Sequence, residues 1–470
     1  MRIPNRFQYQ QEDLGEGTFG VVRAYVDTEH DDRRVAIKEF KSPWVSRLGW
    51  SVDCVRENAF LTLAVGAPHL VQMHEVCSER TKNCFVVLER MKQSLYRHLR
   101  SPGGKRLSDP EVLTLTKGLL TGLEWLHDNG LMHRDLKPQN VLVNDALDEC
   151  KISDFGSMME DVPGRRNTLC VCTRPFCALE ILYGDERYTK KVDVWSMGCI
   201  LYEMVAGRTL FESDGTSVDQ VRSIAYVIGS PSEATWPGIE ALPYFTPDFP
   251  SPGWEPASKD AVDADPSSFF RPGTVAVKVS SYWMRLIRWC LSPSSKRPTA
   301  TELKRALNGD ATTSSCPTTV TSGRGLATSK VRTSRRVVEK GWRASIPDVN
   351  SILNGLADVH DRWKGRARTF EHAYQLLARR HETTGTPPRD AEALCIAALL
   401  VSYKLWEADL GAMEDWFCRD ADSRLERRVL SEEDDLLSCL KWDVVRLSSY
   451  DTRTTGTDDT SKPVRKRKER

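Results

Sequence analysis

The chain has 470 residues, 40% of them hydrophobic and 28% charged, a balance typical of soluble globular proteins. Its net charge of +1 gives no overall attraction to nucleic acid or to a membrane surface, so we expect neither as a direct partner. The longest apolar run, Leu394 to Val401, is too short to span a bilayer, and the N-terminus, MRIPNRFQYQ, lacks the apolar core of a secretory signal.

The 13 cysteines are scattered, odd in number and without a paired CxxC. This usage is typical of a reducing compartment and argues against a disulfide framework and against a zinc site. Cys170 and Cys172 lie two residues apart, but no second pair of ligands accompanies them. We therefore expect neither a disulfide scaffold nor a bound structural metal.

Composition divides the chain into four parts. Residues 1–308 alternate apolar segments with short turns, whereas 12 of the 24 residues from Ala311 to Ser334 are Ser or Thr, which predicts a flexible linker over 309–341. Helical periodicity returns over 342–450. The polar tail 451–470 ends in KPVRKRKER, which is either a nuclear-import or polyanion-binding run or simply a solvated terminus. The expected location is the nucleus or the cytoplasm.

The first part opens on a glycine-rich stretch, GEGTFGVV, in which Gly15, Gly17 and Gly20 form a GxGxxG. Strand-like sequence follows, including VAIK, which ends at Lys38, where a dinucleotide-binding fingerprint would open a helix. Glycines at this spacing let the backbone approach phosphate oxygens, and the lysine can hold two phosphates. The alternative is an ordinary glycine-rich hairpin with a surface lysine.

A helical pattern follows in SVDCVRENAFLTLAV, with its apolar face made by Val52, Val55, Ala59 and Leu63. This helix carries Glu57. A buried lysine needs an anionic partner, and Glu57 can reach Lys38 from here. The alternative is a solvated glutamate, the usual state of a glutamate on a helix.

Two further motifs stand in the expected order. HRDLKPQNVLV begins at His133, with the HRDxxxxN spacing from Asp135 to Asn140, and DFG begins at Asp154. On these motifs, residues 7 to 308 resemble the eukaryotic protein kinases. The resemblance implies an α+β bilobal fold with an N-lobe (1–91) and a C-lobe (92–308), ATP and Mg²⁺ as cofactors, and phosphoryl transfer to Ser or Thr of protein substrates.

The resemblance also assigns roles. Asp135 would orient the substrate hydroxyl and accept its proton, and Lys137 would stabilise charge on the moving phosphoryl group. Asn140 and Asp154 offer the oxygen ligands that Mg²⁺ prefers. Thr173 matches the threonine that braces the catalytic loop. The full expected catalytic set is Lys38, Glu57, Asp135, Lys137, Asn140 and Thr173.

The adenine would lie between apolar side chains and take backbone hydrogen bonds from the segment joining the lobes, with Leu88 as gatekeeper. Plain core packing is compatible with the same apolar positions. The expected ATP-binding residues are Leu14, Gly15, Glu16, Gly17, Gly20, Val22, Ala36, Lys38, Glu89, Met91, Asn140, Leu142 and Asp154.

The branch is indicated by the stretch from Arg208, which ends in SPSEATWPGI and is similar to the cyclin-dependent kinases. Asp193 in DVWSMGCILYEM agrees with this, and Arg297 is placed to pair with Glu180. Counting 12 residues back from Glu180 gives Thr168, the position of the activating threonine in that family.

A phosphate on Thr168 would order the loop by pairing with arginines, and an activating kinase would then be a partner. Arg56 and Arg134 match two of the family's three phosphate partners, and Met159 stands at the third, for which Arg165 or Arg166 could substitute. The alternative is an unmodified threonine.

Several positions depart from the family. Cys177 replaces the arginine before the A-P-E position, which leaves open whether Ser/Thr-Pro sites are preferred. The inhibitory Thr-Tyr pair reads Thr18-Phe19, so Thr18 alone could carry an inhibitory phosphate. VDCVREN stands where the usual cyclin-binding helix signature would be, which indicates an unusual partner.

A second core follows the linker. Every residue from Leu394 to Val401 is apolar over more than two turns, which predicts a helix central to a bundle. Other helical patterns lie near 347–361, 368–381, 409–417 and 430–441. The prediction is a small all-α domain over 342–450.

AALLVSYKLWE, from Ala397, and SEEDDLLSCLKWDV, from Ser431, resemble two motifs of the N-terminal cyclin box. The resemblance implies that Lys404 and Glu433 pair and face the helix that carries Glu57. The chain would then be a kinase fused to its own cyclin-like activator, acting in cis or in trans, in cell-cycle or transcription-related control. One alternative is an unrelated bundle with both charges solvated, and another is a scaffold that recruits other proteins.

Overall fold

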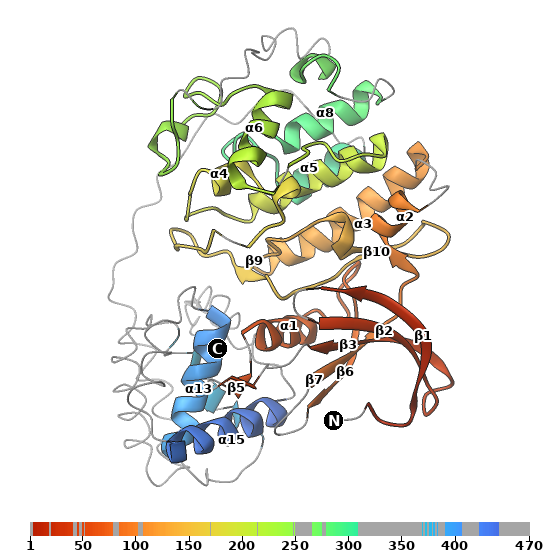
Figure 1. Ribbon diagram of the computed structural model, residues 1–470, viewed down its shortest axis with the longest axis vertical. Helices are drawn as coiled ribbons and strands as arrows, with labels where there is room; N and C mark the ends of the chain where they lie inside the picture. Colours follow the sequence, from red (N-terminus) through yellow and green to blue (C-terminus); the bar gives the residue numbers. More distant parts are fainter. Residues whose placement is uncertain are drawn as a thin grey trace, which may run out of the picture.

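The computed structural model (Figure 1) describes most of the first 308 residues and two long helices near the C-terminus. No described helix is long and apolar enough to cross a membrane. The described residues are 3–17, 20–40, 45–46, 49–50, 52–78, 84–101, 107–169, 171–213, 215–247, 249, 266–274, 279–308, single positions between 369 and 383, 391–406 and 423–440.

The N-lobe is built on a five-stranded antiparallel sheet in the order β1-β2-β3-β7-β6. Alternate residues along its strands point to opposite faces. Val35, Ile37 and Phe85 belong to a small apolar cluster on one face, while the neighbouring Ala36 and Val86 join the main core. The strands are β1 (Phe7–Glu16), β2 (Gly20–Asp27), β3 (Arg33–Phe40), β6 (Met73–Ser78) and β7 (Cys84–Glu89).

Helix α1 (Val52–Leu63) packs its buried Cys54, Val55 and Ala59 into the same main core as Ala36 and Val86. A short hairpin of β4 (Val45–Ser46) and β5 (Gly49–Trp50) precedes it. The helix prediction from SVDCVRENAFLTLAV is therefore confirmed, and α1 ties the sheet to the rest of the protein.

The C-lobe is mainly helical. α3 begins with a capping box, in which the Ser108 N–H donates to the Glu111 carboxylate over 2.6 Å, and α5 ends at Gly207, whose φ of 73° favours glycine. Its helices are α2 (Leu95–Arg100), α3 (Asp109–Asp128), α4 (Leu179–Leu182), α5 (Lys191–Ala206), α6 (Ser217–Ile228), α8 (Ser281–Cys290) and α9 (Ala300–Leu307).

Short strands and 3₁₀ turns lie in the loops that connect the larger elements from β8 onward. The strands are β8 (Gln93–Ser94), β9 (Leu131–Met132), β10 (Val141–Val143), β11 (Cys150–Ile152) and β12 (Met159–Glu160). The 3₁₀ turns are η1 (Pro138–Asn140), η2 (Arg174–Phe176), η3 (Ile239–Ala241) and η4 (Pro266–Phe269).

Two C-terminal helices, α13 (Ala391–Trp406) and α15 (Ser423–Cys439), lie beside the N-lobe (Figure 1). α13 packs against α15, α1 and β12, and its described side chains are buried throughout. Contact with several neighbours explains why its sequence lacks a polar face, as the run from Leu394 to Val401 predicted.

The remaining C-terminal predictions are tested only in part. α15 begins at Ser423, so the boundary predicted at residue 430 is wrong; its first turns, SRLERRVL, are too polar to show a continuous apolar stripe. The described positions between 369 and 380 are helical, in agreement with the pattern over 368–381. The helices predicted at 347–361 and 409–417, the linker 309–341 and the tail 451–470 lie outside the described residues.

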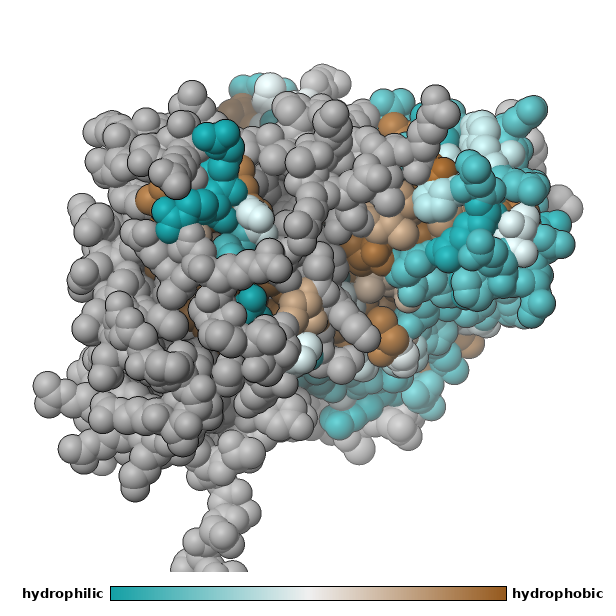
Figure 2. Space-filling model, turned by 90° about the horizontal axis from the view of Figure 1, so that it is seen from below, coloured by the Kyte–Doolittle hydropathy of each residue, from teal (hydrophilic) through white to brown (hydrophobic). Residues whose placement is uncertain are grey.

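The surface seen from the N-lobe end is mainly hydrophilic on the side of the sheet, with smaller hydrophobic areas (Figure 2). The β1 strand agrees with this, because after the buried Phe7 its residues are exposed or partly exposed. The apolar residues that α1 covers, such as Ala36 and Val86, lie on the side of the sheet that faces the main core.

The C-lobe contains the buried ion pair that the sequence predicted. The two terminal guanidinium nitrogens of Arg297 donate to the two carboxylate oxygens of Glu180, at 2.7 and 3.0 Å, and Arg297 is only 1% exposed. The guanidinium also lies 5.2 Å from the centre of the Trp195 ring. The pair joins the segment before α9 to α4.

We expect Arg297→Ala to destabilise the protein by about 3–5 kcal/mol, because it leaves the Glu180 carboxylate buried without its partner. Urea denaturation of the full chain measures this. Arg166→Ala is the matched control, since its ion pair with Glu186 is exposed, and it should leave the midpoint nearly unchanged. Equal shifts for the two variants would contradict the assignment.

Candidate active site

The glycine-rich turn joins β1 to β2, and the Gly17 N–H donates to the Gly20 carbonyl over 3.0 Å. A Cβ on Gly20 would lie 2.6 Å from the Glu39 carbonyl oxygen, so this position requires glycine. A Cβ on Gly15 or Gly17 would meet nothing within 4 Å. The turn therefore leaves open space of the kind that phosphate oxygens need. Thr18 lies outside the described residues.

Lys38 on β3 meets Glu57 on α1 in a buried ion pair. Its Nζ lies 2.6 Å from both Glu57 carboxylate oxygens and 3.4 Å from Asp154 Oδ1. Lys38 and Glu57 are 8% and 2% exposed. Burial alone would lower the pKa of Lys38, but the two carboxylates raise it above its ordinary value, so the side chain stays charged.

Asp154 follows β11, and its φ of 65° turns the backbone into the left-handed region. Burial would raise the pKa of its carboxyl, but Lys38, His133 and Lys137 lower it overall. Asn140 in η1 donates its amide nitrogen to the Asp135 carbonyl over 2.8 Å, so its amide oxygen is the atom that it can offer to a cation. An ionised carboxylate and an amide oxygen are a donor set that fits Mg²⁺.

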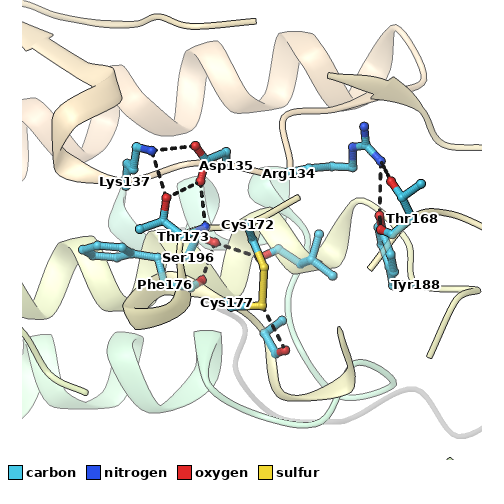
Figure 3. Close-up of a disulfide and its surroundings, with 12 residues drawn as sticks. Arg134, Asp135, Lys137, Thr168, Cys172, Thr173, Phe176, Cys177, Tyr188 and Ser196 are labelled. Carbon is cyan, nitrogen blue, oxygen red and sulfur yellow. Dashed lines mark hydrogen bonds and ion pairs between the residues drawn. A yellow bond between two sulfur atoms is a disulfide. The ribbon is translucent and has the colours of Figure 1, made fainter. Parts of the chain in front are cut away.

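Asp135, Lys137 and Thr173 form a closed triangle (Figure 3). Asp135 Oδ1 accepts from the Thr173 N–H at 2.8 Å and from its hydroxyl at 2.7 Å. Lys137 Nζ donates to Asp135 Oδ2 at 2.7 Å and to Thr173 Oγ1 at 2.8 Å. The carboxylate is thus held in one orientation from both sides.

The loop that carries Asp135 is anchored on α5. Asp193 accepts from the backbone N–H of His133 at 2.9 Å and of Arg134 at 2.8 Å, and its carboxylate also bonds His127 Nε2 at 2.9 Å. Burial would raise the pKa of Asp193, but these donors lower it. His127 was missed in the sequence, where nothing distinguishes it from an ordinary core histidine.

The apolar residues expected to bind adenine come from four strands, β1, β2, β3 and β10, and gather in one core. Leu14, Val22, Ala36 and Leu142 pack in the same apolar cluster, and Ala36 pairs with Leu88 in the register of β3 and β7.

Glu89 closes the strand that leads to Met91. Its carboxylate accepts from the Gln72 N–H and from Lys151 Nζ, both at 2.7 Å. These contacts fix the backbone of the segment between the lobes.

Thr168 lies where Arg134 can reach it (Figure 3). Arg134 Nη1 donates to the Thr168 hydroxyl over 3.3 Å, and the Tyr188 hydroxyl donates to the Thr168 carbonyl over 2.6 Å. The described hydrogen bond of Arg56 is not made with Thr168: the Arg56 Nε donates to the Lys404 carbonyl over 2.8 Å. Arg56 therefore also belongs to the contact between α1 and α13.

Lys404 and Glu433 bond to each other, joining α13 to α15, and they are 1% and 0% exposed. The alternative that both are solvated charges is therefore wrong. Burial lowers the pKa of Lys404, and Glu433 opposes this effect. The pair lies at the end of α13 that meets α1.

Among the residues that the structure describes, one disulfide is present, between Cys172 and Cys177, whose Cα atoms lie 5.5 Å apart. The spacing of the cysteines did not predict this single bond, because the 3₁₀ turn η2 brings its two residues together. The other cysteines whose side chains the structure describes form no disulfide: Cys54, Cys77, Cys150, Cys199, Cys290 and Cys439.

The comparisons with known proteins agree with this geometry. Residues 9–307 match the protein kinase domain family. The chain is similar to a solved structure of the CAK complex of Chaetomium thermophilum bound to ATP-gamma-S, with 30% identity and a TM-score of 0.55, over 64% of this chain and 90% of the other.

It is also similar to a chain of the yeast RNA Pol II CTD kinase CTDK-1 complex, with 25% identity and a TM-score of 0.54, over 65% of this chain and 93% of the other. A kinase domain implies the use of ATP. The chain belongs to the protein kinase family.

Proposed function

We propose that this chain is a Ser/Thr protein kinase of the cyclin-dependent type that is activated by its own C-terminal helices. The observation that carries the proposal is the contact of α13 with α1, the helix whose Glu57 holds Lys38. The helix that completes the active site is thus packed directly against the C-terminal part of the same chain.

In the phosphoryl transfer, MgATP supplies the phosphoryl group and the cation that shields its charge. Asp135 orients the substrate hydroxyl and accepts its proton, because Thr173 and Lys137 hold its carboxylate in place. Lys137 places a positive charge beside Asp135, where it would stabilise the negative charge on the phosphoryl group during transfer. Asn140 and Asp154 would hold Mg²⁺.

The nucleotide itself would be held at three places. Lys38 and the backbone of the glycine-rich turn would bind its phosphates. The apolar cluster around Ala36 and Leu142 would enclose its adenine, and the backbone of Glu89 and Met91 would bind the adenine edge.

Activation would come from the position of α1. Kinase activity requires the ion pair between Lys38 and Glu57. A part of the chain that packs better against α1 when this pair is formed favours that position of α1. Arg56 Nε on the Lys404 carbonyl, together with the buried Lys404–Glu433 pair, ties α13 to α1 in the arrangement that closes Glu57 onto Lys38.

A tethered activator needs little intrinsic affinity. A coil of about 35 residues has a mean span of roughly 30–35 Å, and it keeps its two ends at an effective concentration of order mM. Activity would then follow Thr168 phosphorylation by an activating kinase and not the abundance of a separate cyclin. The similarity to an RNA Pol II CTD kinase favours transcription-related control over the cell cycle, in the nucleus or the cytoplasm.

We expect Asp135→Asn to lower phosphoryl transfer to a Ser/Thr peptide by about 10²–10⁴-fold, because the acceptor of the hydroxyl proton is lost. Radiolabel transfer from ATP measures this. Asp145→Asn, at a side chain that is 80% exposed, is the control and should match the unchanged protein. Full activity of the Asp135 variant would contradict its role.

We expect Lys404→Ala and Glu433→Ala to lower kcat by about tenfold or more, since each breaks the buried Lys404–Glu433 ion pair beside α1, and removing one member of a buried pair costs about 3–5 kcal/mol. Ser431→Ala, at an exposed position of α15, is the control. Unchanged activity in both variants, with equal activity of residues 1–310 and the full chain, would favour the scaffold interpretation.

Mixing separates cis from trans action. An equimolar mixture of the Asp135→Asn and Lys404→Ala chains should show no more activity than its Lys404→Ala chain has alone if each C-terminal part acts only on its own kinase domain, as in the described contact. Recovery of activity would show that the activator works between chains.

We expect phosphorylation of Thr168 to raise activity, because the added charge of about −1.5 to −2 pairs with Arg134. Phosphopeptide mass spectrometry locates the group. Phosphatase treatment should then lower the activity of the unchanged protein and leave Thr168→Ala unaffected. An equal response of both proteins would contradict Thr168 as the regulatory site.

A further inference from the structure

The disulfide between Cys172 and Cys177 encloses Thr173, the residue that braces Asp135 and Lys137 (Figure 3). Cys172 is the direct chain neighbour of Thr173. The bond therefore constrains the same backbone that places the Thr173 N–H and hydroxyl on the Asp135 carboxylate.

The Cys177 side of this loop is fixed to the C-lobe. Within η2 the Phe176 N–H donates to the Thr173 carbonyl and the Cys177 N–H to the Arg174 carbonyl, both at 3.0 Å. Ser196 of α5 donates to the Phe176 carbonyl over 2.8 Å, and Phe176 and Cys177 are buried. Through the disulfide, the partly exposed Cys172 is fastened to this buried anchor.

We propose that the Cys172–Cys177 bond is a thiol–disulfide switch that sets the position of Thr173 and thereby the productive binding of protein substrates. It rests on the chain's being an active kinase, and not on the activating role of α13. In a reducing compartment a disulfide that does form is usually transient and catalytic or redox-sensing rather than structural. The cysteine usage of this chain is typical of such a compartment.

The reductant would be a dithiol, either a small molecule or a protein of the thioredoxin class. One of its thiolates attacks the accessible sulfur of Cys172, and the Cys177 sulfur leaves as a thiolate. The second thiol of the reductant then attacks the mixed disulfide and releases Cys172. In total, one disulfide and one dithiol become two cysteine thiols and one disulfide of the reductant, with two electrons and two protons transferred.

One contact would hold the Cys177 side chain in place after the disulfide is reduced. Cys177 Sγ lies 3.8 Å from the Ala178 carbonyl oxygen, which can accept from the thiol once the bond is broken. Cys177 thus keeps a buried position in both states, whereas Cys172 is released. The segment before Thr173 then loses its covalent tie, while Lys38, Glu57 and Asp154 are untouched.

We therefore expect reduction to change the kinetics of the protein substrate and not those of ATP. In the full chain, reduction with dithiothreitol should lower kcat/KM for a Ser/Thr peptide by about tenfold, since small displacements of positioning groups have effects of this size or larger. The KM for ATP should not change. Reoxidation should restore the activity.

The test compares three full-length proteins, with and without dithiothreitol. Cys172→Ser cannot form the bond and should behave as the reduced protein in both conditions. Cys77→Ser, which changes a partly buried thiol on β6, is the matched control and should respond as the unchanged protein does. Peptide kinetics and ATP kinetics are measured for each.

Alkylation followed by peptide mapping reports the bond itself. Burial raises the pKa of the Cys150 and Cys290 thiols to about 12, so these groups stay protonated and react slowly in the native protein near pH 8. Cys172 and Cys177 should resist alkylation until the protein is reduced. Cys170 lies outside the described residues, and the map shows whether it takes part.

Three results would overturn the switch: alkylation of Cys172 and Cys177 without reduction, pairing of Cys170 with either of them, or equal responses of Cys172→Ser and the unchanged protein. A chain that forms the bond and transfers no phosphoryl group in either state would contradict the kinase activity as well. A chain with Lys404→Ala that still responds to reduction would separate the switch from the activator.

Discussion

The ion pair between Lys38 and Glu57 is the interaction on which the rest of the site depends. A buried ammonium is stable only with its partner in place, so α1 must lie where Glu57 meets β3. Asp154 is drawn to the same ammonium, which joins the segment after β11 to the N-lobe. Whatever packs on the far side of α1 therefore acts on the phosphate end of the site, and in this chain that neighbour is α13.

Much of this site could be predicted because its chemistry requires particular residues at fixed short spacings. The distance from Asp135 to Asn140, the glycines before β2 and the lysine on β3 are each visible within a few residues. The pairing of Lys38 with Glu57 followed from a rule of charge: a buried cation needs an anion. The pairing of Lys404 with Glu433, which lie 29 residues apart, followed instead from the resemblance to the cyclin box.

The contacts that the sequence did not show depend on tertiary structure. His127 and Asp193 are 66 residues apart, and only the packing of α3 on α5 brings them together. The polar first turns of α15 hid where that helix begins. The bond between Cys172 and Cys177 needs the turn of η2, which a count of cysteines cannot reveal. Arg56 has a helix-terminal carbonyl as its partner, and backbone atoms leave no mark in a sequence.

Two residues of the catalytic centre, Arg134 and Asp154, hold φ angles of 68° and 65°. Residues other than glycine rarely adopt this backbone conformation, which costs about 1–3 kcal/mol at each position. Asp193 holds the first through the Arg134 N–H, and the Lys38 ammonium lies against the carboxylate of the second. Folding and catalysis thus compete at these residues. Substitutions that relax the backbone here would make the fold more stable while disordering the groups that transfer phosphate, so thermal stability and turnover cannot both be maximal.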